Sequence, residues 1–150
     1  MTYNNLNKST KIKYSYMLIV FLYIALLVIS LFLALFDNYY FELGLTIITL
    51  ITLFTMLYLG FNYIYFSDDG NIIILRYYSL NPLFSEPKSI EIPKSSFSKF
   101  QIEHSFFGIK KSVILYQKTK NGIAKYPSVS FSALNTKEVE RIQMALEKYA

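Results

Sequence analysis

The chain opens with two long apolar runs. Met17 to Phe36 contains twenty residues without a charge, and Leu43 to Tyr65 is a second uncharged run. As a helix, the first run extends about 30 Å, which is the thickness of the hydrocarbon core of a bilayer. The pattern predicts transmembrane helices over 17–36 and 43–65, joined by a short extracytoplasmic loop over 37–42. So short a loop requires the two helices to form an antiparallel hairpin.

A secretory signal peptide is the alternative interpretation of the first run, because Lys8, Lys11 and Lys13 give it a positive leading segment. However, the apolar run is longer than the roughly 7–15 residues of such a signal. Phe36 also stands where cleavage would need a small residue. We therefore interpret the run as an uncleaved anchor that follows a cytoplasmic segment, 1–16.

Lysines and aromatic residues indicate the orientation and boundaries of the hairpin. The segment 1–16 has three lysines and no acid, the loop 37–42 has acids and no base, and all other basic residues follow the second run. The positive-inside rule then places both termini in the cytoplasm. Aromatic residues flank both runs, as is typical of the headgroup region: Tyr14, Tyr16, Tyr39, Tyr40, Phe41, Tyr58, Phe61, Tyr63 and Tyr65.

Small and hydroxylated residues recur within the two runs. The first run contains Ala25, Ser30 and Ala34, and the second has a threonine at every third position, Thr46, Thr49, Thr52 and Thr55. We interpret them as close packing within the hairpin, with each hydroxyl bonded to a carbonyl of its own helix. A seam for a partner helix is the alternative. Neither run contains an ionisable group, so a proton or ion pathway lacks its usual marker.

Apolar and polar residues alternate after Tyr65, which is typical of β-strands. Asp68-Asp69-Gly70 and Lys120-Asn121-Gly122 have the composition of hairpin turns. Pro127 cannot donate to a ladder, so its strand should be an edge or carry a bulge. The pattern does not decide whether the loop 80–88 contains a seventh strand. The alternation predicts six strands: 63–67, 71–79, 89–92, 97–103, 111–119 and 123–131.

The last predicted element is a helix over 136–149. Asn135 suits the N-cap position, and Glu138 lies where a capping box needs an acid. The helix has one apolar stripe, which must cover an apolar surface such as the open end of a curled sheet: Val139, Ile142, Leu146 and Tyr149. Residues 66–150 are enough for one small core. Because no linker follows the second run, the sheet must sit directly on the bilayer.

The order of these elements, together with several short segments, resembles a known family. The segments are Arg76-Tyr77-Tyr78, Ile90-Glu91-Ile92-Pro93, Phe100-Gln101-Ile102, Gly108-Ile109-Lys110-Lys111 and Asn121-Gly122. Over residues 63–150 the chain resembles the bacterial pleckstrin-homology-like (PH-like) domains that follow paired membrane helices. The resemblance implies an α+β membrane protein of the bacterial inner membrane, with a bent β-sheet or barrel that the C-terminal helix closes. It also implies a binding platform without catalytic residues.

Candidate catalytic or metal-binding residues are few. His104 is the single histidine, and it stands beside Glu103 without a nucleophile or second ligand nearby. Cysteine is absent, which excludes disulfides, thiolate metal sites and cysteine nucleophiles. Common nucleotide, hydrolase and metalloprotease motifs are also missing. We expect no enzyme activity, no cofactor and no metal. Other acidic residues are explained by a turn or a helix face: Asp68, Asp69, Glu138, Glu140 and Glu147.

Basic residues give the predicted lipid-binding or partner-binding surface. The chain has 15 Lys and Arg against 10 Asp and Glu. Within a Debye length of an anionic leaflet, each lysine contributes about 1 kcal/mol to membrane binding, although strand-end lysines also prevent edge aggregation. Phe106-Phe107 either dips into the membrane or joins the core. Five lysines follow on one predicted hairpin and its approach: Lys110, Lys111, Lys118, Lys120 and Lys125.

These features predict a non-enzymatic, membrane-anchored binding module. Its PH-like domain is held at the inner leaflet and binds a protein partner, with anionic lipid as a second ligand. The alternative is a small accessory subunit that docks into a larger inner-membrane complex through its helices. An immunity protein against a membrane toxin fits the size and topology, but no residue supports it. Neither nucleic acid nor a small-molecule substrate is expected.

Overall fold

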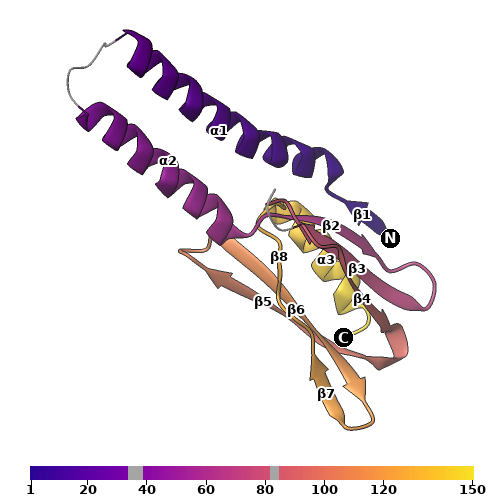
Figure 1. Ribbon diagram of the computed structural model, residues 1–150. Helices are drawn as coiled ribbons and strands as arrows, with labels where there is room; N and C mark the ends of the chain where they lie inside the picture. Colours follow the sequence, from indigo (N-terminus) through magenta and orange to yellow (C-terminus); the bar gives the residue numbers. More distant parts are fainter. Residues whose placement is uncertain (34–38, 82–84) are drawn as a thin grey trace.

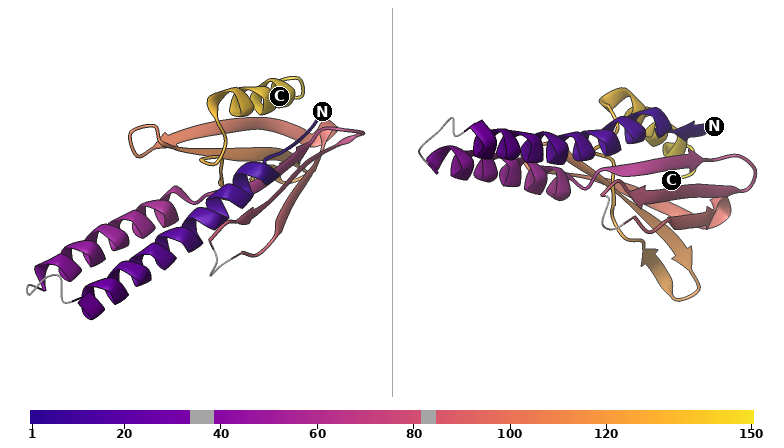
Figure 2. Two further views of the ribbon diagram at one scale, coloured as in Figure 1. Left: turned by 90° about the horizontal axis from the view of Figure 1, so that it is seen from above. Right: turned by 45° about the horizontal axis from the view of Figure 1, so that its top comes forward.

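Two antiparallel helices extend from a β domain in the computed structural model, which describes residues 1–33, 39–81 and 85–150 (Figure 1). Helix α1 comprises Leu6–Leu33 and helix α2 comprises Tyr40–Leu59, and they lie side by side in each view (Figure 2). Both are long and apolar enough to cross a membrane. Helix α1 begins at Leu6 rather than at Met17, so its 28 residues extend about 42 Å.

The first sixteen residues, expected only as a cytoplasmic segment, belong to the folded domain. Strand β1 (Thr2–Asn4) pairs antiparallel with β2 (Asn62–Ser67), where Tyr3 is opposite Phe66. Ile12, in the second turn of α1, packs against the domain core. Three residues are too few to show strand periodicity, so the sequence did not predict β1. The start of α1 is therefore held against the domain by strand pairing and by core packing.

The first sheet has the order β1-β2-β3-β4, and all of its pairs are antiparallel. Strand β3 is Ile72–Ser79 and strand β4 is Lys88–Pro93. Helix α2 spans Tyr40–Leu59 rather than the predicted 43–65, because the chain leaves the helix at Gly60 and residues 62–65 already belong to β2. Only Gly60 and Phe61 separate the helix from the strand, so the sheet follows the helix without a linker, as predicted. Gly60 has φ +59, the left-handed conformation in which helices commonly end.

The second sheet begins after a short 3-10 helix, η1 (Lys94–Ser96). The sheet consists of β5 (Phe97–Ser105), β6 (Lys110–Thr119), β7 (Gly122–Lys125) and β8 (Val129–Ser130). The predicted strand 123–131 is thus divided in two.

Pro127 lies between β7 and β8, both of which pair with β6. Three residues lie between Lys125 and Val129, whereas two lie between their partners Tyr116 and Val113. The extra residue interrupts the ladder where proline has no N–H to donate, as predicted for a bulge.

The described strands form two sheets rather than a closed barrel, and both sheets contribute to one core. From the first sheet, Ile64, Phe66 and Leu75 are buried, and from the second, Val113 and Leu115. The barrel form of the expected fold is therefore not present. Of the loop 80–88, where a seventh strand was left open, 85–87 contains no strand and 82–84 lies outside the described residues.

Helix α3 (Thr136–Glu147) completes this core with Val139, Ile142, Ala145 and Leu146. Its capping box is formed as predicted. The Asn135 side chain accepts from the Glu138 N–H at 2.9 Å, and the Glu138 carboxylate accepts from the Asn135 N–H at 2.7 Å. The chain is therefore an α+β protein with N-terminal helices, antiparallel sheets and a C-terminal helix.

Candidate functional site

The turn between β5 and β6 lies beside the end of α2. The rings of Phe106 and Tyr58 have centroids 5.4 Å apart, and the Phe107 ring lies 6.0 Å from the Phe106 ring. The Nζ atom of Lys110 lies 4.6 Å from the centroid of the Tyr58 ring. Tyr58 belongs to the last turn of α2, where an aromatic residue is typical of the membrane interface. We call Phe106, Phe107 and Ile109 the aromatic tip.

The backbone of the aromatic tip is strained. Phe106 and Phe107 both have φ +53, and Gly108 follows with φ +84. A bulky residue in this left-handed region costs about 1–3 kcal/mol, and such conformations concentrate at functional sites. The Ile109 N–H donates to the Phe106 carbonyl at 3.1 Å and closes the turn. The result is a Phe107 side chain that is 99% exposed.

The predicted lysines do not form one surface. A strand rises about 3.3 Å per residue, so Lys118 lies about 26 Å along β6 from Lys110. Lys120 and Lys125 share the far end, in the hairpin formed by β6 and β7 (Figure 1). We call Lys118, Lys120 and Lys125 the distal basic hairpin. Lys111 is also separate, because its Nζ donates to the Thr136 hydroxyl at 3.1 Å at the start of α3.

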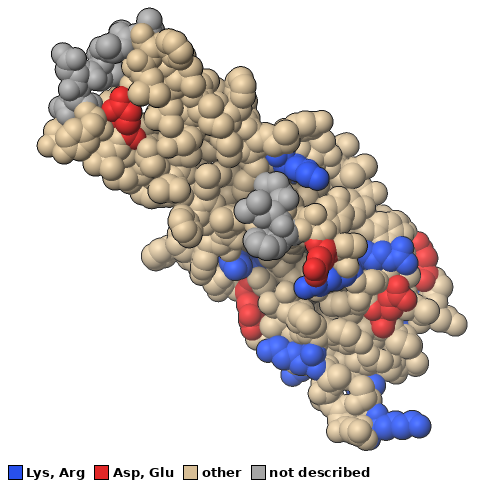
Figure 3. Space-filling model, in the orientation of Figure 1, with Lys and Arg blue, Asp and Glu red and all other residues tan. Residues whose placement is uncertain are grey.

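The distal basic hairpin carries charge of one sign. Residues 105–137 contain six lysines and no acidic residue. Lys118, Lys120 and Lys125 are exposed. On the face shown in Figure 3, charged side chains of both signs are scattered over the domain, whereas the helical hairpin is nearly free of them. An exposed surface with charge of one sign, such as the distal basic hairpin, attracts acidic partners.

Polar contacts from the N-terminal segment fix the position of α1. The Met1 ammonium pairs with Asp68 and lies 2.9 Å from Oδ1 of Asp69. These bonds raise the pKa of the Met1 ammonium, and they lower the pKa of Asp69 to about 2. Lys8 Nζ lies 2.5 Å from Oε2 of Glu138 at the start of α3. The turn acids and the capping acid are thus also ion-pair partners of the N-terminal segment.

A buried asparagine joins α1 to β2. The Asn5 side chain donates to the Asn62 carbonyl at 3.0 Å and accepts from the Ile64 N–H at 2.8 Å. Its Oδ1 also accepts from the Ser9 hydroxyl at 3.0 Å. Because Asn5 is only 3% exposed, few water molecules can replace these bonds.

Hydrogen bonds join the two helices within the hairpin. The Tyr23 hydroxyl and the Thr46 hydroxyl are 3.0 Å apart, and the Ser30 hydroxyl donates to Oε1 of Glu42 at 2.5 Å. Glu42, expected in the connecting loop, belongs to the first turn of α2. Ser30 is buried and Ala25 is half-buried. Ala34 lies outside the described residues.

The threonine series does not form one face of α2. Each residue advances 100° around a helix, so Thr55 lies opposite Thr46. Thr46 and Thr49 are half-buried, whereas Thr52 and Thr55 are exposed. Each of the four hydroxyls donates to the carbonyl four residues earlier. The structure therefore brings only the first two threonines into the hairpin, because a period of three drifts away from the seam.

The candidate catalytic residues lie apart from one another. His104 is exposed on β5 opposite Lys111, and Glu140 and Glu147 are exposed on α3. In the part of the chain that the structure describes, no group of three His, Cys, Asp or Glu residues could hold a metal ion.

Comparison with known proteins finds no match, since no protein-family model, curated protein or solved structure matches this chain. The PH-like resemblance therefore remains a prediction.

Sequence reasoning missed the contacts of Met1, Asn5 and Lys8 and the role of Tyr58. Tyr58 was identified as an interfacial aromatic, but 48 positions separate it from Phe106. The one available signal was Asn5, which is a favourable N-cap residue directly before a helix that begins at Leu6.

Proposed function

We propose that this chain is a non-enzymatic binding module anchored in a bacterial inner membrane, with both termini in the cytoplasm. Its domain is an open, two-sheet variant of the PH-like fold. The observation that supports this proposal is that the two ends of the domain differ in chemistry. An apolar tip lies at the end of α2, and an exposed basic hairpin lies about 26 Å away along β6.

The aromatic tip enters the headgroup region of the cytoplasmic leaflet. Phe107 is exposed, and through Phe106 it lies beside Tyr58 in the last turn of α2, where the helix would leave the membrane. Burying one phenylalanine side chain contributes about 1.5–3 kcal/mol. Lys110 beside Tyr58 adds about 1 kcal/mol toward anionic headgroups. The tip thus holds the domain in one orientation and binds anionic lipid.

The distal basic hairpin binds an acidic protein partner. It lies about 26 Å along β6 from Lys110, well beyond the Debye length of about 8 Å at physiological salt, so the headgroups that Lys110 meets do not engage it. Lys118, Lys120 and Lys125 are exposed and face no acidic residue on their own hairpin. A protein with a complementary acidic patch would meet all three lysines at once.

Photo-crosslinking from position 123 of the full chain in intact membranes tests this proposal. Ile123 is exposed within the hairpin and can be replaced by a photoreactive residue. We expect a crosslink to one acidic protein. The double reversal Lys118→Glu and Lys120→Glu should weaken the crosslink about tenfold, which corresponds to 1.4 kcal/mol. The matched reversal Lys137→Glu and Lys148→Glu, at exposed positions of the α3 segment, should leave it unchanged.

An absent crosslink, or one that survives the hairpin reversal, would refute partner binding at this surface. Crosslinks from Thr52 or Thr55 instead would support the accessory-subunit alternative, because those two residues are exposed on α2.

A further inference from the structure

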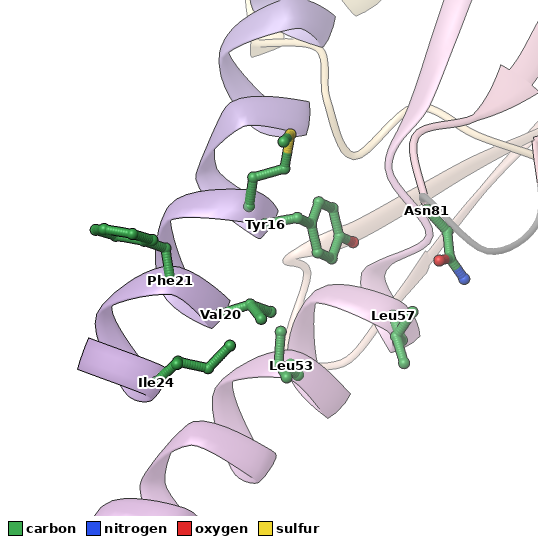
Figure 4. A pocket seen from close by; sticks show the side chains of 8 residues that line it. Tyr16, Val20, Phe21, Ile24, Leu53, Leu57 and Asn81 are labelled. Atoms are coloured by element: carbon green, nitrogen blue, oxygen red, sulfur yellow. The ribbon is translucent and has the colours of Figure 1, made fainter. Parts of the chain in front are cut away.

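A groove lies between α1 and α2 at their domain end. Its volume is about 490 Å³, and its wall includes Tyr16, Val20 and Ile24 of α1 and Leu53 and Leu57 of α2. Val20 and Leu53 point toward one another across the gap between the helices (Figure 4). Asn81 lines the end of the groove that is nearest the domain. The volume falls within the range of about 300–1,000 Å³ that is typical of ligand sites.

The depth of the groove corresponds to one leaflet. Tyr16 and Ile24 are eight residues apart, which is about 12 Å along α1. The hydrocarbon half of a bilayer is about 15 Å thick, and the apolar run begins at Met17. The groove wall is apolar except at its domain end, so it offers water few hydrogen-bond partners. Its occupant is therefore a lipid chain or an apolar protein segment.

The mouth of the groove is polar and basic. Met17 also lines a second cavity of about 320 Å³, whose wall includes Ser9, Lys13 and Tyr14. Lys13 is exposed and makes no ion pair within the described part of the chain. Residues 1–32 contain no acid that could neutralise it.

Two further basic residues line a neighbouring cavity, where Lys88 is exposed and Arg76 is paired with Glu91 at 3.6 Å. Tyr78 lines the second cavity and also a third of about 290 Å³, whose wall includes Arg76 and Lys88. An apolar slot of leaflet depth that opens beside cationic side chains matches the two chemical parts of an anionic lipid.

We propose that this groove binds one anionic glycerophospholipid of the leaflet that faces the domain. An acyl chain lies between Val20 and Leu53, and the phosphate meets the Lys13 ammonium. The inference rests on the membrane-spanning hairpin of the proposed function. It goes beyond that function, because the site lies on the helices rather than on the aromatic tip. The occupant comes from the bilayer itself, so the site needs no soluble ligand.

Native mass spectrometry of the full chain tests this inference. The chain is released from nanodiscs that contain equal amounts of phosphatidylglycerol and phosphatidylcholine. We expect one retained phosphatidylglycerol per chain. Leu53→Phe should remove it by filling the groove, whereas the control Ile48→Phe, at an outward position that is 65% exposed, should keep it.

Two lysine variants test the headgroup contact. Lys13→Gln should weaken retention about fivefold, which corresponds to the roughly 1 kcal/mol that one lysine contributes near anionic headgroups. The control Lys11→Gln removes the same charge from the same helix, but Lys11 does not line the groove and retention should not change. Circular dichroism of each variant checks that the helices remain folded.

Equal retention by Leu53→Phe and Ile48→Phe, or by Lys13→Gln and Lys11→Gln, would overturn the lipid site. So would a protein segment crosslinked to position 20 in place of lipid. A chain that resists carbonate extraction and keeps its hairpin crosslink, yet retains no lipid, would refute this inference alone. A chain that carbonate extracts would refute the membrane anchor of the proposed function.

Discussion

The side chain of Asn5 accepts a hydrogen bond from the backbone N–H of Ile64 at 2.8 Å, although 59 positions separate the two residues. This contact lies where β1, α1 and β2 meet. It joins the start of α1 to the first sheet through buried hydrogen bonds.

Replacing Asn5 should therefore be costly. Asn5→Ala removes bonds to Asn62, Ile64 and Ser9 and leaves buried backbone groups without partners. We expect the free energy of unfolding to fall by about 2–3 kcal/mol. Denaturant unfolding in one detergent measures the change. Asn7→Ala, at an exposed position two residues after Asn5, is the control and should stay within about 0.5 kcal/mol. Equal losses would show that α1 is not coupled through Asn5.

The ion pair between Lys8 and Glu138 should depend on pH. Burial raises the pKa of Glu138, but the Lys8 ammonium, the Asn135 N–H and the Tyr3 hydroxyl together lower it below its usual value. A lowered carboxyl pKa stabilises the fold above the ordinary glutamate pKa of about 4.3, and this stabilisation is lost as pH falls through the folded pKa.

Glu138→Gln tests this dependence, because glutamine can still complete the capping box. At pH 7 we expect it to lower the free energy of unfolding by about 0.5–1 kcal/mol. The difference from the natural chain should shrink below pH 4. Thermal unfolding over a pH series measures it. Glu140→Gln, which is exposed on the same helix, should show no such trend. A difference that grows in acid would contradict the assignment.

Relief of the strained aromatic tip should stabilise the protein in detergent. Phe107 has φ +53 and is 99% exposed, so Phe107→Gly removes strain and few contacts. We expect a gain of about 1 kcal/mol in the free energy of unfolding. In nanodiscs the same variant should lose protection from hydrogen exchange in the β5–β6 turn. Phe106→Gly relieves the same φ but loses the Tyr58 contact, so it should give no gain. A stabilised Phe107→Gly with unchanged exchange would argue against membrane contact.

Threonines at the two ends of the series should behave differently. Thr46→Val removes the contact with Tyr23 and should destabilise the hairpin by about 0.6 kcal/mol, a typical value for interhelical hydrogen bonds in membranes. Thr52→Val and Thr55→Val should change it little, because both residues are exposed. Unfolding in mixed micelles measures each variant. Equal effects at 46 and 55 would indicate a packed seam along the whole series.

Local patterns determined several elements of this protein. Two uncharged runs predicted the paired helices, and alternation predicted most strands, because burial on one face imposes a period. The Asn135 cap and the stripe through Ile142 predicted α3, since capping and amphipathicity are properties of neighbouring residues. Pro127 predicted the interruption between β7 and β8 for the same reason.

The tertiary structure decided how distant residues meet. Strand β1 depends on its partner β2, because its three residues carry no periodic signal of their own. The aromatic tip meets Tyr58 only because β5 and β6 turn back at the end of α2. Lys110 and Lys118 are close in sequence, but an extended strand holds them about 26 Å apart. Periodicity is a local property of the chain, whereas a surface is made by chain reversals, which the sequence does not place in space.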